Sequence, residues 1–193
     1  GSPDNAPARR FGASVWWTWT APTNGPVRVH TFGSTFDTVL GIYTGRRVGA
    51  LTRVASNDEA PGTREVSLVT FAAKEGTPYQ IQVGGAQQGG PAGGGAATGA
   101  IHLAGQMLPS VEITAPTNHA EFVIPTNLVV TATASSPYGR VTQVTFYRGN
   151  EWLGASTTEP YRVAVNDAPP GSNRLSAVIT DSAGMMATSA VVQ

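Results

Sequence analysis

Alternation of apolar and polar residues runs along most of the chain, in stretches of about five to nine residues. In NLVVTATAS, residues 127–135, Leu128, Val130, Ala132 and Ala134 share one face, and the threonines between them share the other. Glycine, proline, asparagine and aspartate separate such stretches, as expected of turns between strands. An amphipathic helical repeat is hard to find. One face of each strand is thus expected to be buried and the other hydrated, as in an antiparallel β-sandwich.

Two further stretches repeat this pattern in the second half of the chain. VTQVTFYRG places Val144 and Phe146 on one face, and RLSAVITDSAG places Leu175, Ala177 and Ile179 on one face. The chain is therefore predicted to be all-β.

A break in the pattern falls in GQMLPSVEITAP, where the strand AIHLAG gives way through Pro109 to a new strand, Val111 to Thr114. We predict two tandem antiparallel sandwich domains, residues 1–108 and 109–193, because 193 residues suffice for two ordinary cores. The glycine-rich segment 84–100 is expected to be a mobile hairpin loop between YQIQV and AIHLA.

Composition narrows the range of partners. The chain has 12 basic and 12 acidic residues and no cysteine. A balanced charge gives no electrostatic attraction for nucleic acid or an anionic membrane, and the lack of cysteine excludes disulfides and thiolate zinc sites. No apolar run approaches the roughly 20 residues of a membrane helix, so no membrane insertion is expected.

Catalytic motifs are absent from the sequence. The three histidines, His30, His102 and His119, are scattered, and no G-x-S-x-G, H-E-x-x-H or G-x-x-x-x-G-K motif occurs. No two acidic residues are marked as a catalytic pair. The chain is therefore predicted not to be an enzyme.

Three of the four tryptophans lie in SVWWTWTAP, residues 14–22. On a strand, Val15, Trp17 and Trp19 point one way and are predicted to fill the core, while Trp16 points the other way. Trp16 is then either covered by a loop or a neighbouring domain, or it is a platform for a sugar ring. Trp152, in the turn RGNEWLG, is the second candidate for ligand binding, with local packing as the alternative.

Four residues carry oxygen ligands of the kind that calcium prefers. Asp37 lies in FDTVL, and Asn57, Asp58 and Glu59 lie in SNDEAPG. One carboxylate at a strand end and a short loop with its carbonyls could supply much of a calcium shell of six to eight oxygens. The alternative is that Asp37 caps a turn and the loop acids are solvated.

The second half resembles the bacterial immunoglobulin-like modules of secreted enzymes and surface proteins, over residues 110–193. The resemblance rests on ITAPTN, VTQVTFYRGNEWLG, EPYRVAV and LSAVITDSAGMMATS. It implies an immunoglobulin-like sandwich that serves as a spacer or presenting stalk.

The first half resembles the bacterial pre-peptidase C-terminal domain, over residues 12–105. The resemblance rests on SVWWTWTAPTNG, TFGSTFDTVLGIYTG, VASNDEAPG and VSLVTFAAKEGTPYQIQVGG, in that order. It implies a sandwich of jelly-roll or CUB-like type, in which Asp37 and the Asn57-Asp58-Glu59 loop match recurring D-T and N-D-D positions, with Glu59 in place of the last aspartate. Such domains commonly have one or two further strands upstream, where this chain has only PDNAPARRFGA. We therefore expect an open strand edge, which either this arm or another chain fills.

Together these features predict noncatalytic accessory, binding or presenting modules of a larger secreted or cell-surface bacterial protein. The partner is expected to be a polysaccharide or another surface protein. One alternative is a carbohydrate-binding module that anchors a secreted hydrolase to polysaccharide, and another is a purely structural spacer without a ligand.

Overall fold

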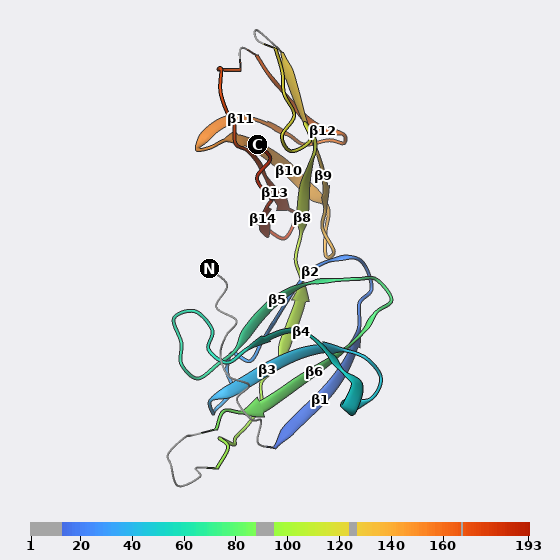
Figure 1. The fold of residues 1–193 in the computed structure, drawn as a ribbon, viewed down its shortest axis with the longest axis vertical. Helices are drawn as coiled ribbons and strands as arrows, with labels where there is room; N and C mark the ends of the chain where they lie inside the picture. Colours follow the sequence, from blue (N-terminus) through green and yellow to red (C-terminus); the bar gives the residue numbers. More distant parts are fainter. Residues whose placement is uncertain (1–12, 88–94, 124–126, 167) are drawn as a thin grey trace. The chain divides into compact units, whose positions relative to one another are not determined.

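The computed structural model describes residues 13–87, 95–123, 127–166 and 168–193. The chain divides into two compact units, Gly1–Gln106 and Met107–Gln193. The regular structure in the described residues consists of antiparallel strands and one short 3-10 helix, η1 (Val48–Ala50) (Figure 1). The predicted all-β fold is confirmed. No helix in this part of the chain is both long and apolar enough to cross a membrane.

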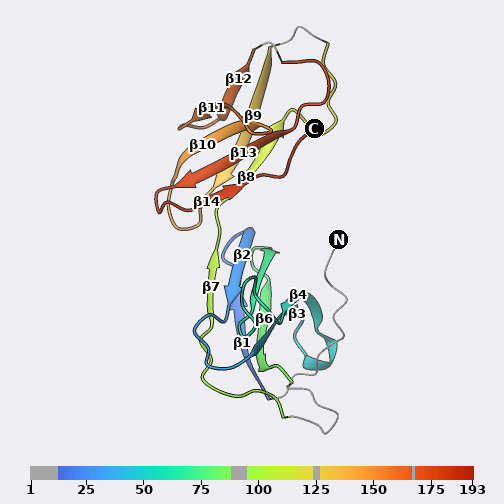
Figure 2. The same cartoon turned by 90° about the vertical axis from the view of Figure 1, so that its left-hand side faces the viewer.

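The first unit contains a four-stranded and a three-stranded sheet. The four-stranded sheet has the order β1 (Ser14–Thr20), β6 (Pro78–Gly85), β3 (Thr38–Thr44) and β4 (Thr52–Asn57). The three-stranded sheet has the order β5 (Leu68–Ala73), β2 (Gly25–His30) and β7 (Ala104–Met107). Figure 2 shows β2 and β7 side by side, with β1 and β6 in the neighbouring layer.

The core of this unit lies between the two sheets. On β6, Tyr79, Ile81 and Val83 are buried on the face that meets the second sheet. The ring centroid of Phe71, on β5, lies 5.0 Å from that of Tyr79, which joins the two layers. The opposite face of β6, which carries Gln80, is the outer face of the unit.

Strand β1 is the edge strand of the larger sheet, and its exposure corrects one prediction. Val15, Trp17 and Trp19 pair with Val83, Ile81 and Tyr79, so they lie on the core side, as predicted. However, Val15 is 47% exposed and Trp17 is 37% exposed. They do not fill the core, because a three-stranded layer faces a four-stranded one, and among the described residues no further strand covers the rim of the larger sheet. Trp19 is half-buried, with its ring centroid 5.9 Å from that of Tyr79.

The glycine-rich segment also differs in part from the prediction. Gly84 and Gly85 belong to β6 and are buried, and the Ala97 amide donates to the Ala86 carbonyl beyond them. Residues 88–94 lie outside the described residues, as does most of the upstream arm, residues 3–12. The predicted strand AIHLAG is displaced, since β7 begins at Ala104 and residues 100–103 are not in a strand.

The second unit is also built from a four-stranded and a three-stranded sheet. The larger has the order β11 (Glu151–Ser156), β10 (Val141–Arg148), β13 (Leu175–Asp181) and β14 (Met186–Thr188). The smaller has the order β12 (Tyr161–Val165), β9 (Leu128–Ser135) and β8 (Ser110–Ala115).

Side chains on the inner faces of both sheets form the core of the second unit. Its fully buried residues include Val144, Phe146, Ala177 and Ile179, each 0% exposed. Leu128 and Ala134 are half-buried against this core, on the face that the sequence assigned to them. The alternation in the second half of the chain thus predicted the buried faces correctly.

Candidate functional site

The outer face of the four-stranded sheet carries an exposed pair of aromatic rings. Trp16 on β1 and Tyr43 on β3 lie on either side of β6, and their ring centroids are 5.7 Å apart with an interplanar angle of 39°. Trp16 is 36% exposed, and Tyr43 is half-buried. Trp16 was predicted to lie on this face. Its partner was not predicted.

Two residues between the rings explain how the rings come together. In the antiparallel register, Trp16 pairs with Gln82, and Gln82 pairs with Gly41. A Cβ atom at Gly41 would lie 2.7 Å from the Cε2 and Oη atoms of Tyr43, so Tyr43 lies over this glycine. The rings cover Gln82, which is only 7% exposed. A ring that covers a strand glycine also stabilises a sheet, so this pair has a structural role in any case.

Polar groups surround the two rings. The Thr18 hydroxyl donates to Oε1 of Gln80 at 2.7 Å, which leaves the Gln80 amide nitrogen without an acceptor among the described residues. Arg53 on β4 pairs with Tyr43 and is exposed. Burial raises the pKa of the Tyr43 phenol, and the Arg53 charge opposes this in part. Tyr43 therefore keeps its hydroxyl proton at neutral pH and can donate a hydrogen bond.

The exposed part of the outer face is limited to this end of the sheet. Val39 and Gly84, which lie on the same face beside Ser14, are buried. The surface formed by Trp16, Tyr43, Thr18, Gln80 and Arg53 is called the outer platform below. It offers two aromatic planes, hydroxyl groups, an amide and one cation, the kinds of group that hold a sugar by stacking and hydrogen bonding.

Trp152, the second predicted ligand-binding tryptophan, lies on β11 in the second unit. It is 64% exposed and pairs in register with Tyr147 on β10. Its ring is therefore largely accessible, and ligand binding by this ring stays a prediction. It makes no ring-ring contact with another described residue, so it offers a single aromatic plane rather than a pair.

The predicted calcium ligands have mixed environments. The Asn57 side chain donates to the Glu59 carbonyl at 3.0 Å and accepts from the Leu68 amide at 3.0 Å, so it shapes its own loop. Glu59 is exposed, and Asp37 and Asp58 are half-buried. No group of three or more histidine, aspartate or glutamate residues in the described part of the chain is placed to hold a metal ion. Calcium binding at these residues stays a prediction.

Tyr43, Gln80 and Arg53 were not identified from the sequence. The stretch VLGIYTG contains one usable signal, since alternation puts Gly41 and Tyr43 on the face opposite to Ile42. This face lies next to Trp16 only because both strands pair with β6, and the residues of β6 that pair with β3 lie 35 to 47 residues later in the chain than their partners. Local patterns carry no information about such a pairing.

A comparison with protein-family models matches the bacterial Ig domain to residues 109–177. The second unit thus carries a bacterial immunoglobulin-like domain, as its sequence predicted. Domains of this family are typically noncatalytic, and they occur mainly in secreted and surface proteins. The match does not extend to residues 12–105, so the resemblance of the first unit to the pre-peptidase C-terminal domain stays a prediction. No curated protein matches the chain.

Several solved structures are similar to this chain or to part of it. The fibronectin(III)-like modules of CbhA from Clostridium thermocellum are 30% identical, with 43% of this chain and 90% of that chain covered and a TM-score of 0.41. A GH2 beta-galacturonidase from Eisenbergiella tayi bound to glycerol is 13% identical, with coverage of 94% and 35% and a TM-score of 0.35. A beta-glucuronidase from an uncultured Clostridium sp. is 14% identical, with coverage of 92% and 34% and a TM-score of 0.32. The chain spans about a third of the length of these last two proteins.

Proposed function

We propose that the chain is a pair of noncatalytic accessory modules of a larger secreted or cell-surface bacterial protein, and that its first unit binds polysaccharide. The bacterial Ig domain over residues 109–177 supports the accessory role. The observation that carries the binding role is the ring pair of the exposed Trp16 and the half-buried Tyr43 on the outer platform. The first unit would then be a sandwich of the pre-peptidase C-terminal type that has acquired a sugar-binding face.

The geometry of the platform favours single polysaccharide chains over flat crystalline surfaces. The two rings are inclined by 39°, so they do not form one plane. A flexible chain can present successive sugar rings to two inclined aromatic planes, while Thr18, Gln80 and Arg53 supply hydrogen bonds at the sides. Contacts of this kind are weak individually and gain strength when several modules act together.

A pull-down experiment tests this function with a matched control. Wild type, Trp16→Ala and Trp17→Ala are each incubated with insoluble xylan and mannan and with amorphous, non-crystalline cellulose and chitin, and the bound fraction is measured. Trp17 is the matched control because it is 37% exposed against 36% for Trp16, and lies on the opposite face of the same strand. We expect Trp16→Ala to lose binding and Trp17→Ala to retain it.

Two results would contradict the binding role. If wild type binds none of the four polysaccharides, the structural-spacer alternative is favoured. If Trp16→Ala binds as well as wild type, the Trp16 ring helps to cover Gln82 but does not hold a ligand. The accessory role would survive both results, because it rests on the second unit.

A further inference from the structure

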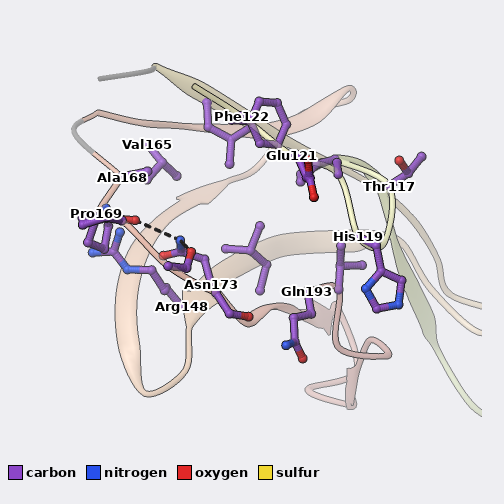
Figure 3. Close-up of a pocket in the computed structure, with 18 residues that line it drawn as sticks. Thr117, His119, Glu121, Phe122, Arg148, Val165, Ala168, Pro169, Asn173 and Gln193 are labelled. Carbon is purple, nitrogen blue, oxygen red and sulfur yellow. Dashed lines mark hydrogen bonds between the residues drawn. The ribbon is translucent and has the colours of Figure 1, made fainter. Parts of the chain in front are cut away.

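A cavity of about 530 Å³ lies at one end of the second unit, apart from the outer platform. The loop 116–122 forms one wall and the loop 168–173 forms the other (Figure 3). Most of the lining is apolar, and its larger apolar side chains are Phe122, Leu128, Val165, Leu175 and Val192. The volume falls in the range of small-ligand sites, roughly 300 to 1,000 Å³.

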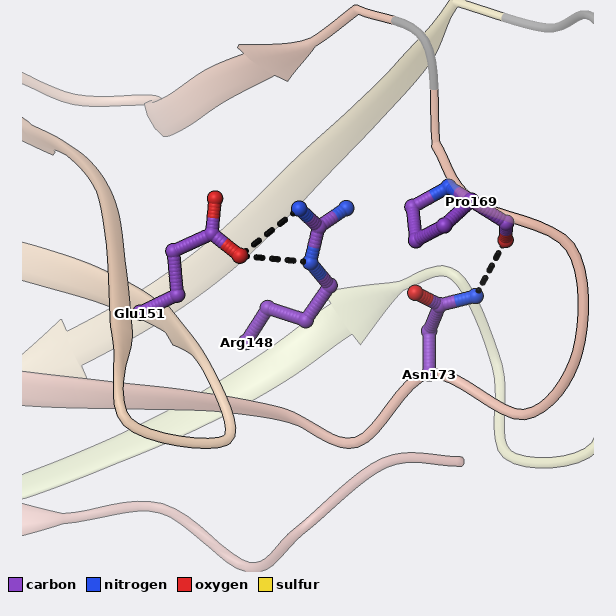
Figure 4. Close-up of polar contacts among 4 residues, drawn as sticks. All are labelled: Arg148, Glu151, Pro169 and Asn173. Carbon is purple, nitrogen blue, oxygen red and sulfur yellow. Dashed lines mark hydrogen bonds and ion pairs between the residues drawn. The ribbon is translucent and has the colours of Figure 1, made fainter.

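Arg148, at the end of β10, brings an unpaired hydrogen-bond donor to this cavity. Its Nε and Nη2 atoms both donate to Oε2 of Glu151, at 3.1 and 2.7 Å. Its Nη1 atom is buried and has no hydrogen-bond partner. Figure 4 shows Nη1 on the side of the guanidinium that points away from Glu151 and toward Pro169. A buried N–H donor of a charged group is costly to leave unpaired, so an acceptor in the cavity would be stabilised there.

Asn173, at the end of the loop 168–173, offers the complementary acceptor beside Arg148 (Figure 3). Its Nδ2 atom donates to the carbonyls of Pro169 and Gly171, at 3.1 and 3.0 Å, which fixes both the loop and the orientation of the amide. No described residue donates to its Oδ1 atom. In Figure 4, this oxygen and the Nη1 atom of Arg148 both point toward the space between the two side chains.

We propose that this cavity binds a polypeptide segment, with one peptide group held between Arg148 and Asn173 and an adjacent apolar side chain against the lining. The carbonyl of that peptide group would accept from Arg148 Nη1, and its N–H would donate to Asn173 Oδ1. Complementarity of charge favours a neutral amide over a carboxylate, because Glu151 already balances Arg148 and Glu121 also lines the cavity. A sugar is disfavoured because the lining offers more apolar than polar surface and its larger side chains are mostly apolar.

Binding of a small amide to the full chain tests this inference. The probe is N-acetyl-L-leucine N-methylamide, followed by ¹⁵N–¹H NMR with the backbone amides of Leu175 and Val192 as reporters. We expect saturable shifts at these positions. Arg148→Lys keeps a positive charge opposite Glu151 but removes the free Nη1 donor, so affinity should fall about tenfold or more. Arg140→Lys, at an exposed arginine of the same unit, should bind as wild type does.

A second variant covers the case in which Arg148→Lys does not fold, as judged from the dispersion of its spectrum. Phe122 is 49% exposed, so Phe122→Ala should fold and should also weaken binding. The proposal is overturned if the probe gives no saturable shift in wild type, or if the folded variants bind as tightly as wild type. It is also overturned if isovalerate or methyl α-D-glucopyranoside binds more tightly than the amide.

Discussion

Trp16 and Tyr43 come together over a glycine, with their ring centroids 5.7 Å apart and Gly41 beneath the Tyr43 ring. The position of the Tyr43 ring depends on the glycine at position 41, because any larger side chain there would collide with the ring. The outer platform therefore depends on a residue that makes no ligand contact of its own.

Replacing Gly41 with alanine should weaken polysaccharide binding without removing either ring. The new Cβ would lie 2.7 Å from two Tyr43 atoms, so the ring must shift from its present position beside Trp16. Overpacking of this kind costs about 1–3 kcal/mol of stability. Bound fraction and melting temperature of the variant check this expectation.

Gly49→Ala is the matched control, since a Cβ at Gly49 would meet nothing within 4 Å. It should leave both measurements close to wild type. Binding by Gly41→Ala at the wild-type level would mean that the position of Tyr43 does not matter for the ligand.

The two core-side tryptophans of β1 should differ in their contribution to stability. Trp17 is 37% exposed, so Trp17→Ala should lower the free energy of unfolding of the first unit by about 1–2 kcal/mol. Trp19 is half-buried against Tyr79, so Trp19→Ala should cost more, about 2–4 kcal/mol. Urea denaturation followed by circular dichroism measures both values. Equal losses would show that Trp17 is as well packed as Trp19.

The buried faces of the second unit could be predicted because they depend on local alternation alone. Leu175, Ala177 and Ile179 are alternate residues of β13, so their side chains lie on one face of the strand, and all three are buried. The same reasoning placed Trp17 on the correct side of β1 but not in the core. Its exposure depends on how far the facing sheet extends, and that distance is a property of the whole unit.

The contact between Trp16 and Tyr43 could not be predicted from local sequence for a similar reason. Trp16 and Tyr43 are neighbours only because β6 pairs with both β1 and β3. Trp16 alone could be proposed as a platform, since its side of the strand follows from alternation. The error in the predicted strand AIHLAG has a different cause. The strand observed there, β7, is only four residues long, and so short a stretch of alternation does not define where a strand begins and ends.

Calcium binding at Asp37 and the Asn57-Asp58-Glu59 loop predicts a higher melting temperature in the presence of the ion. A ligand at one hundred times its Kd would stabilise the first unit by about 2.7 kcal/mol. Differential scanning calorimetry with calcium or a chelator measures the shift, and Asp37→Asn should abolish it. An unchanged midpoint, with no heat in titration calorimetry, would leave Asn57 as a turn-forming residue and remove the metal site.

The edge of β1 predicts concentration-dependent self-association. Its seven residues pair with β6 in an unbroken register and include no charged side chain, so little on this strand opposes pairing with a further strand. Light scattering should detect dimers at high concentration, and Thr20→Lys should reduce them. Thr133→Lys, at an exposed site of the second unit, is the control. A monomer at every concentration would contradict pairing between chains and favour the N-terminal arm as the segment that fills the edge.

The most direct test of sugar binding by the outer platform is NMR of the four tryptophan indole N–H groups during titration with xylohexaose, mannohexaose, cellohexaose or chitohexaose. The Trp16 indole donates to the Ser14 hydroxyl at 3.1 Å on the binding face, so its signal should report contact there. We predict a saturable shift of the Trp16 signal with at least one oligosaccharide, while the signals of Trp17, Trp19 and Trp152 stay in place. No shift at Trp16 with any of them, or a larger shift at another tryptophan, would contradict the assignment of the binding face.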